Sequence, residues 1–85
     1  MSSTMVIVLF FAGAREVVGE REAQLDLGAD AVTVSELTRK IERRWPALGP
    51  YLRSTRVAVN GTYAKATDPV RAGDEVALIP PVAGG

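Results

Sequence analysis

Hydrophobic residues follow one another without a break near the start of the chain. The run MVIVLFFA, from Met5 to Ala12, is rich in β-branched and aromatic residues. It predicts a strand buried on both faces, as in the centre of a sheet. A helical turn from Ala14 to Val18 is expected next, because Gly19 suits the position just after a helix end. The following segment, REAQLDL, alternates polar and apolar residues and predicts a half-exposed strand.

The segment TVSELTRKIERRW, from Thr33 to Trp45, has the periodicity of an amphipathic helix. Thr33 and Glu36 have the spacing of a capping box, in which each side chain accepts a hydrogen bond from the other residue's backbone N–H. Pro46 disfavours helical geometry at Trp45 and should end the helix there. The residues expected to face the core are Val34, Leu37, Ile41, Trp45 and Leu48.

The last third of the chain predicts three more strands. In RVAVNGTYA, two short strands flank Asn60-Gly61, a strong hairpin signal. Turns at Asp68-Pro69 and around Gly73 lead to a last strand from Glu75 to Ile79. The order of elements predicts an α+β protein of the β-grasp type. We expect a mixed sheet of about four to five strands on one main helix, with the first and last strands parallel and adjacent at its centre.

The composition restricts the chemistry. The 85 residues suit one domain, and they include neither cysteine nor histidine. Disulfides, thiolate nucleophiles and zinc sites of the Cys/His type are therefore excluded, and no metal site is expected. The ten basic and ten acidic residues cancel, so neither nucleic acid nor a membrane is expected as a partner. The apolar run is too short to span a bilayer and no basic region precedes it, so we expect a cytoplasmic protein.

Internal residues offer only weak candidates for chemistry. Asp74 and Glu75 should point to opposite faces of a strand, which favours a structural role. The run RKIERR has Glu36 four residues before Lys40 and is interpreted as a solvated helix face rather than an anion-binding patch. The remaining candidates are Val6, Phe10 and Phe11, expected in the core, and Tyr63, expected at the surface.

The ending PPVAGG is the strongest candidate for a functional site. We expect a flexible leader over residues 1–4, a domain over 5–81 and an extended tail over 82–85. Gly84 and Gly85 lack Cβ atoms, so this backbone can enter a channel too narrow for side chains. Pro80 and Pro81 fix φ and stiffen the exit from the last strand. The terminal carboxylate is a weak nucleophile, but another enzyme can activate it with ATP.

Three stretches carry a family resemblance: VLFFAGAREVVG, VAVNGTYA and DPVRAGDEVALIPPVAGG. Together they resemble the small subunit of molybdopterin synthase, a ubiquitin-like sulfur carrier, from about Met5 to Gly85. The first stretch is the more discriminating, because other sulfur carriers share the tail motif. Many relatives have an aromatic residue before the two prolines, where this chain has Ile79.

The resemblance implies a carrier subunit rather than a catalyst, with no bound cofactor. An adenylyltransferase resembling ubiquitin-activating enzymes would use ATP to activate Gly85, which then becomes a thiocarboxylate. The tail would enter the large synthase subunit, in an expected heterotetramer, and donate sulfur to cyclic pyranopterin monophosphate in molybdenum cofactor biosynthesis. Catalytic groups are expected on the large subunit. The residues that would position the tail or let it pass are Pro80, Pro81, Val82, Ala83 and Gly84.

Other functions remain open at this point. The chain could carry sulfur for thiamin thiazole, cysteine or tRNA thiolation, which copurified partners would distinguish. It could also be a ubiquitin-like modifier joined through Gly85 to lysines of target proteins, which isopeptide-linked ladders would support. A β-grasp binding module with an inert tail is the third alternative.

Overall fold

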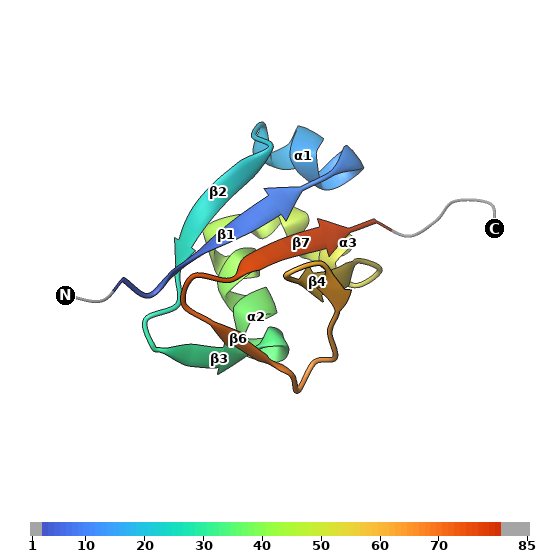
Figure 1. Cartoon of the computed structure of the whole chain (residues 1–85). Helices are drawn as coiled ribbons and strands as arrows, with labels where there is room; N and C mark the ends of the chain where they lie inside the picture. Colours follow the sequence, from blue (N-terminus) through green and yellow to red (C-terminus); the bar gives the residue numbers. More distant parts are fainter. Residues whose placement is uncertain (1–2, 81–85) are drawn as a thin grey trace.

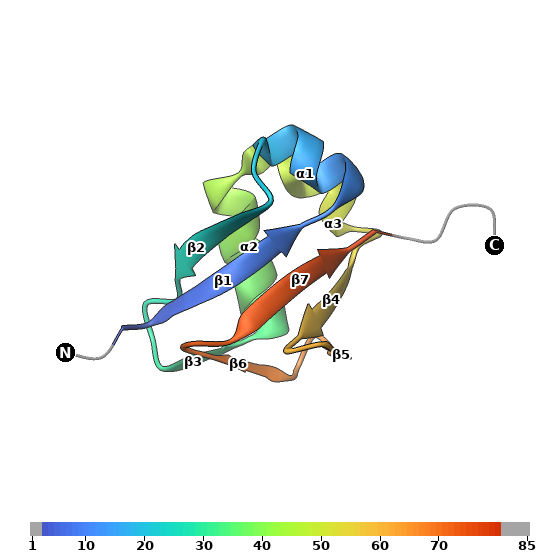
Figure 2. The same cartoon turned by 45° about the horizontal axis from the view of Figure 1, so that its top comes forward.

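The computed structural model describes residues 3–80. Five strands form a mixed sheet in the order β2-β1-β7-β4-β5, and two more form a small sheet, β3-β6 (Figures 1 and 2). The strands are β1 (Met5–Phe10), β2 (Glu22–Asp26), β3 (Ala31–Thr33), β4 (Arg56–Val59), β5 (Thr62–Tyr63), β6 (Pro69–Arg71) and β7 (Glu75–Ile79). The helices are α1 (Ala12–Val18), α2 (Val34–Arg44), the 3-10 turn η1 (Pro46–Leu48) and α3 (Gly49–Leu52).

The first and last strands lie side by side at the centre of the larger sheet. β1 and β7 are parallel, with Val8 beside Val76 and Phe10 beside Leu78. β1 pairs antiparallel with β2, and β7 pairs antiparallel with β4. The predicted β-grasp arrangement is therefore confirmed, with five strands in the main sheet.

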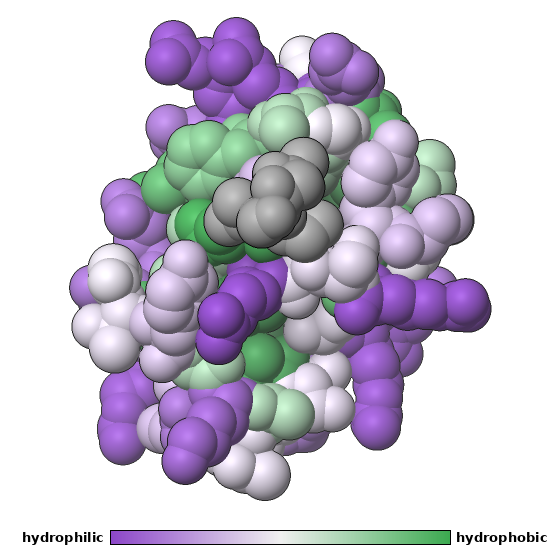
Figure 3. Space-filling view, turned by 90° about the vertical axis from the view of Figure 1, so that its right-hand side faces the viewer, coloured by the Kyte–Doolittle hydropathy of each residue, from purple (hydrophilic) through white to green (hydrophobic). Residues whose placement is uncertain are grey.

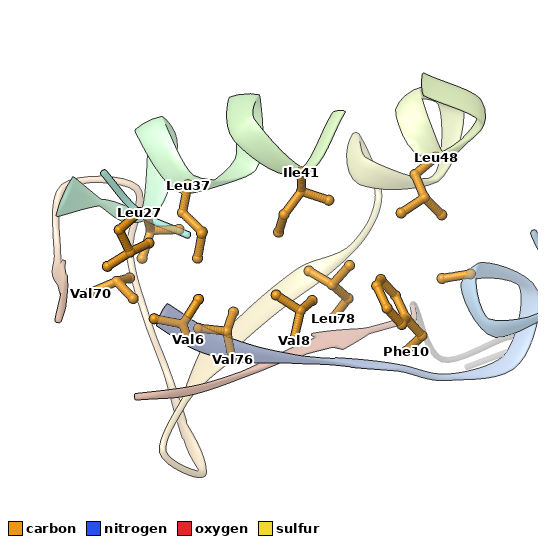
Figure 4. Packing of buried hydrophobic residues seen from close by; sticks show 12 residues of the cluster. Val6, Val8, Phe10, Leu27, Leu37, Ile41, Leu48, Val70, Val76 and Leu78 are labelled. Atoms are coloured by element: carbon orange, nitrogen blue, oxygen red, sulfur yellow. The ribbon is translucent and has the colours of Figure 1, made fainter. Parts of the chain in front are cut away.

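The core lies between α2 and one face of the larger sheet (Figure 4). Every second residue of β1 and β7 points toward the helix, where Leu37 and Ile41 face them. Burying one such side chain contributes roughly 1.5–3 kcal/mol. The predicted helix stripe is confirmed, because Val34, Leu37, Ile41 and Leu48 are buried and Trp45 is half-buried. Trp45 also meets Phe10 edge to face, with ring centroids 5.0 Å apart.

Local signals fix both ends of α2. The Thr33 hydroxyl accepts a hydrogen bond from the Glu36 backbone N–H at 3.1 Å, and the Thr33 N–H donates to the Glu36 carboxylate at 3.0 Å. Both halves of the predicted capping box are thus present. At the other end the helix stops at Arg44, and Pro46 begins the 3-10 turn. Gly19 ends α1 with a φ of 83°, as its sequence position predicted.

Two expectations about the first strand are wrong. β1 is buried on one face only, because its alternate residues, such as Ile7 and Leu9, are half-exposed on the face opposite α2. Phe11 is 43% exposed instead of lying in the core. Helix α1 also begins at Ala12, two residues earlier than predicted. The apolar run therefore contributes side chains both to the core and to the opposite, partly exposed face of the sheet.

The small sheet of β3 and β6 was not predicted, since strands of three residues carry no readable alternation. In the described part of the chain, residues 3–80, no helix is long and apolar enough to cross a membrane. Residues 1–2 of the predicted leader, residue 81 at the end of the predicted domain and all of the predicted tail, residues 82–85, lie outside the described range.

Candidate functional site

The base of the predicted tail lies at the end of the central strand β7. Ile79, the last residue of β7, pairs with Arg56 of β4, and Pro80 follows it directly. Pro80 is half-buried. Strand β7 is held by neighbours on both sides, so it gives the following residues a rigid point of origin. The other predicted site residues lie outside the described range: Pro81, Val82, Ala83, Gly84 and Gly85.

The sheet surface opposite α2 is largely apolar beside this point, and we call it the outer face. Its central residues lie on β1, β7, β4 and β5, and Phe11 extends it at the end of β1. A shallow depression of about 350 Å³ lies on it. Figure 3 looks onto the end of the molecule where β7 finishes, and hydrophobic surface gathers there beside the grey residues. The residues lining the depression are Leu9, Phe11, Ala58, Gly61, Tyr63, Glu75, Ala77 and Ile79.

Phe11 is presented by a strained turn between β1 and α1. Ala12 has a φ of 47°, a left-handed conformation that residues other than glycine seldom adopt. The Phe11 carbonyl accepts hydrogen bonds from the N–H groups of Ala14 and Arg15, at 3.1 and 3.3 Å. The turn thereby ends the strand and leaves the Phe11 ring at the surface, next to Leu9. Strain of this kind is often found at functional positions.

Tyr63 borders the outer face on the side of β5 and is 58% exposed. It lies opposite Ala58 in the β4–β5 hairpin. The guanidinium carbon of Arg56 lies 4.6 Å from the centroid of its ring, a cation–π contact. Tyr63 is therefore an exposed side chain, as expected from the sequence, with a positive charge fixed beside it.

Asn60 fixes the hairpin turn to the start of β7. Its side-chain amide donates to the Asp74 carboxylate at 3.0 Å and accepts from the Glu75 N–H at 2.9 Å. Its backbone N–H donates to the Glu75 carbonyl at 2.8 Å. Asp74 also accepts from the Arg71 N–H at 2.8 Å, so its predicted structural role is confirmed. These bonds fix the positions of Gly61 and Glu75, two residues of the depression, relative to each other.

Two carboxyl groups have clearly lowered pKa values, and neither lines the outer-face depression. The pKa of Asp26 is lowered by the hydrogen bond from the Thr4 hydroxyl, and further by the bond from the Gly28 N–H. The pKa of Glu36 is lowered by the hydrogen bonds of the capping box with Thr33. Such bonds favour the ionised form of each group. Both carboxylates therefore serve the fold.

The outer face is suited to binding the surface of another protein rather than to catalysing a reaction. Its middle is apolar, and Glu75 and Arg56 place one charge of each sign at its edge. Among residues 3–80, no group of three or more potential metal-ligating side chains of the His, Cys, Asp and Glu types lies together. An apolar surface with a polar rim is typical of protein interfaces.

Sequence reasoning did not identify the outer face. In β1 the outward residues Ile7 and Leu9 are as hydrophobic as the inward ones, so the alternation is invisible. One signal was available. A protein with a single main helix can cover only one face of its sheet, so an apolar run on a central strand had to leave apolar side chains on the other face.

A mixed sheet that holds one helix, with its last strand central and beside an apolar face, defines the class of ubiquitin-like β-grasp proteins. The crystal structure of small archaeal modifier protein 1 from Haloferax volcanii is similar, with a TM-score of 0.82 and 30% identity. The alignment covers 95% of this chain and 99% of that one. Residues 8–85 match the model of the ThiS family. The chain belongs to the ThiS family.

Relatives within this family confirm the resemblance to the small subunit of molybdopterin synthase. The molybdopterin synthase sulfur carrier subunit of Escherichia coli (strain K12) is 40% identical over 84 residues, which is 95% of this chain and 100% of the relative. A solved complex of subunits 1 and 2 of the molybdopterin-converting factor from Helicobacter pylori 26695 contains a similar chain. That chain is 29% identical with a TM-score of 0.66, and the alignment covers 95% of this chain and 99% of that one.

Proposed function

We propose that this chain is the sulfur carrier subunit of a molybdopterin synthase and that Gly85 carries the sulfur. The observation that supports this most is the position of β7. The central strand of a ThiS-family domain leads directly into PPVAGG, beside an apolar outer face. A rigid body can therefore bind a partner next to the place where the tail begins.

The proposed chemistry takes place at the terminal carboxylate. An oxygen of the Gly85 carboxylate attacks the α-phosphorus of ATP and releases pyrophosphate, so that an acyl adenylate forms. A donor of sulfide-level sulfur then attacks the acyl carbon, AMP leaves, and a thiocarboxylate remains. The thiocarboxylate sulfur attacks a carbon of the pyranopterin precursor, so that a C–S bond forms and a C–O bond of the precursor breaks. Water then hydrolyses the resulting thioester, which leaves the sulfur on the pterin and frees the Gly85 carboxylate. ATP is consumed by the activating enzyme, and the carrier itself needs no bound cofactor.

The proposed partners divide this work. An adenylyltransferase resembling ubiquitin-activating enzymes performs the first step, and the large synthase subunit performs the transfer in a heterotetramer of two large and two small subunits. We assign the outer face to the large subunit, because burying apolar surface there also delivers the tail to that partner. General acids and bases are expected on the large subunit. Gly84 allows passage of the tail, and Pro80, Pro81, Val82 and Ala83 position it.

Removing or extending the last residue tests this function. The chain is incubated with the activating enzyme, ATP, a sulfur donor, the large subunit and the precursor, and molybdopterin formation is measured. Intact-protein mass spectrometry should show one oxygen exchanged for one sulfur. A variant lacking Gly85, or one with an additional C-terminal residue, is expected to show neither product nor exchange while its circular dichroism stays unchanged. Continued activity of the extended protein would rule out the proposal.

Gly84→Val and Ser2→Ala form a matched pair for the narrow-channel hypothesis. The valine adds two methyl groups and a Cβ close to the end of the chain, where a narrow channel would exclude them. We expect Gly84→Val to reduce the transfer rate at least tenfold and Ser2→Ala to leave it unchanged. Equal rates for the two variants would contradict a role for Gly84 in passage.

A second candidate function is protein modification, since a solved relative is itself a small archaeal modifier protein. In that case Gly85 would form isopeptide bonds with lysines of target proteins. Immunoblots of cells expressing the chain with an N-terminal tag would show ladders that disappear when Gly85 is deleted. Sulfur carriage for thiazole, cysteine or tRNA thiolation would instead be recognised by the acceptor enzyme that binds the tail.

A further inference from the structure

Two alanines lie side by side in the floor of the outer-face depression. Ala77 of β7 pairs with Ala58 of β4, and both line the depression. Their neighbours along β7, Val76 and Leu78, are buried on the other face, toward α2. Figures 1 and 2 show the outer face on the near side of β1 and β7, with α2 behind them. The smallest side chains of the outer face therefore lie on its two central strands.

Larger side chains surround this floor in the register of the sheet. At the level of Ala77, β1 contributes Leu9 and β5 contributes Tyr63, one on each side of the alanine pair. Three strand spacings separate Leu9 from Tyr63, which is about 14 Å between their backbones. Only the methyl groups of the two alanines lie in that interval. The row across the larger sheet is Glu22, Leu9, Ala77, Ala58 and Tyr63.

The size and lining of the depression suit one large apolar side chain. Its volume of about 350 Å³ is near the lower end of the range for binding pockets, roughly 300–1,000 Å³. Glu75 is the only charged residue among the described residues that line it, and it lies at the opposite end of β7 from the tail. In protein interfaces, such pockets are filled by a bulky anchor residue of the partner.

The position of Ile79 restricts which partner supplies that anchor. Ile79 lines the depression and is also the last residue of β7, directly before Pro80. A protein that takes the tail therefore lies against the depression, and both proposed partners do so. The large subunit forms the lasting complex in the proposed function, on which this choice rests. Lasting interfaces are larger and more hydrophobic than transient ones.

We propose that the large synthase subunit inserts one bulky apolar side chain into the depression, where it packs on Ala77 and Ala58. Burial of apolar area alone does not fix an orientation, because the hydrophobic effect is non-directional. A side chain enclosed by Leu9, Ile79 and Tyr63 does fix one. Since Ile79 directly precedes the tail, the same contact determines where the tail enters the large subunit. Ala77 is thus a specificity-determining residue, through its small size.

The size of residue 77 tests the proposal in the full-length carrier, with isothermal titration calorimetry against the large subunit. Ala77→Val should weaken binding about tenfold and Ala77→Leu more, because the added methyl groups take the space of the inserted side chain. A flat apolar contact predicts the opposite result, since a larger side chain would bury more apolar area and raise the affinity. Unchanged or raised affinity of both variants would overturn the proposal.

Two controls separate this effect from general damage. Ala31→Leu makes the same change at an exposed position of β3 outside the depression, and it should leave the affinity within about twofold. Equal losses for Ala31→Leu and Ala77→Leu would contradict a local effect. Ala77→Val introduces a residue that strands favour. Its urea midpoint should therefore not fall, and weakened binding with an unchanged midpoint supports the proposal.

The same variants identify other occupants. If Ala77→Leu slows adenylation of Gly85 but binds the large subunit normally, the depression belongs to the activating enzyme. If the carrier alone dimerises and Ala77→Leu abolishes this, a second copy fills the depression. Either result overturns the proposal. The carrier function has its separate test at Gly85: loss of activity without Gly85 supports that function even where Ala77→Leu keeps full affinity and the proposed insertion is wrong.

Discussion

At the scale of single residues, α1 has a residue with a positive φ at each end, but only one of the two is a glycine. Gly19 follows the helix with a φ of 83°, and Ala12 begins it with a φ of 47°. A left-handed conformation costs a residue with a Cβ roughly 1–2 kcal/mol, and glycine avoids most of this cost. The sequence thus relieves strain at one end of α1 and retains it at the other, beside Phe11.

Ala12→Gly should therefore raise the free energy of unfolding, by up to about 1 kcal/mol. The relief of strain is partly offset by the greater freedom of glycine in the unfolded chain. Gly19→Ala is the matched control and should lower stability by about 1 kcal/mol, because nothing lies within 4 Å of the added Cβ and only the backbone is strained. Urea unfolding measures both. A destabilised Ala12→Gly protein would show that the turn at Phe11 is not strained.

Asp26 and Glu36 predict how stability responds to acid. Their hydrogen bonds lower their folded pKa values below the ordinary values of 3.8 and 4.5. The stability that they contribute is complete above those values and is lost as the pH falls through the lower, folded values. Asp26→Asn should therefore destabilise the protein at about pH 7 and do so less at about pH 3. Denaturant midpoints at the two pH values test this, and an unchanged difference would contradict it.

At the scale of elements, α2 contributes most of the helical side of the core. Leu37 and Ile41 are almost fully buried, against β1 and β7. Leu37→Ala or Ile41→Ala should lower the free energy of unfolding by roughly 2–5 kcal/mol, because each leaves a cavity that the sheet cannot fill. The exposed neighbour Glu42 offers a control, since Glu42→Ala removes no buried group. Chemical denaturation measures the losses, and a loss below half a kilocalorie for Leu37→Ala would mean that α2 is not a core element.

Elements with strong local signals could be predicted from the sequence. The capping box at Thr33, the proline after Trp45 and the Asn60-Gly61 turn each depend on neighbouring residues, and the structure has all three. Strands β3 and β6 depend on each other, across more than 30 residues of chain, so no local pattern reveals them. The outer face could not be predicted from the sequence for a different reason. A hydrophobic residue on a strand gives the same sequence pattern whether a helix of the same chain or another protein covers it.

At the scale of the whole molecule, the functional parts are arranged around β7. Its inward side chains complete the core, its outward ones form part of the outer face, and its end leads to the tail. Of the candidate site, the sequence identified the tail, because glycine and proline have distinctive backbone chemistry. It could not identify the outer face, which only sheet pairing assembles from residues more than 60 positions apart.

Ile79→Asp should weaken binding of the large synthase subunit at least tenfold, because it places a charge in the apolar depression next to the tail. Tyr63→Ala, an exposed position, should weaken it several-fold without affecting the core. Val17→Asp makes a comparable change at an exposed position on α1 outside the depression and should leave affinity unchanged. Isothermal titration calorimetry measures all three. Unaltered affinity of both outer-face variants would assign the partner to another surface.

The central place of β7 also affects how the protein is made. Among the described strands, β1 is the first to emerge from the ribosome and β7 is the last. These two strands nevertheless lie side by side in the folded sheet. Until Val76 and Leu78 have emerged, the newly made chain lacks two of its most deeply buried side chains and the strand that joins β1 to β4. Chains cut short before β7 therefore lack part of the core, and we expect proteases to remove them before they compete with complete molecules for a partner.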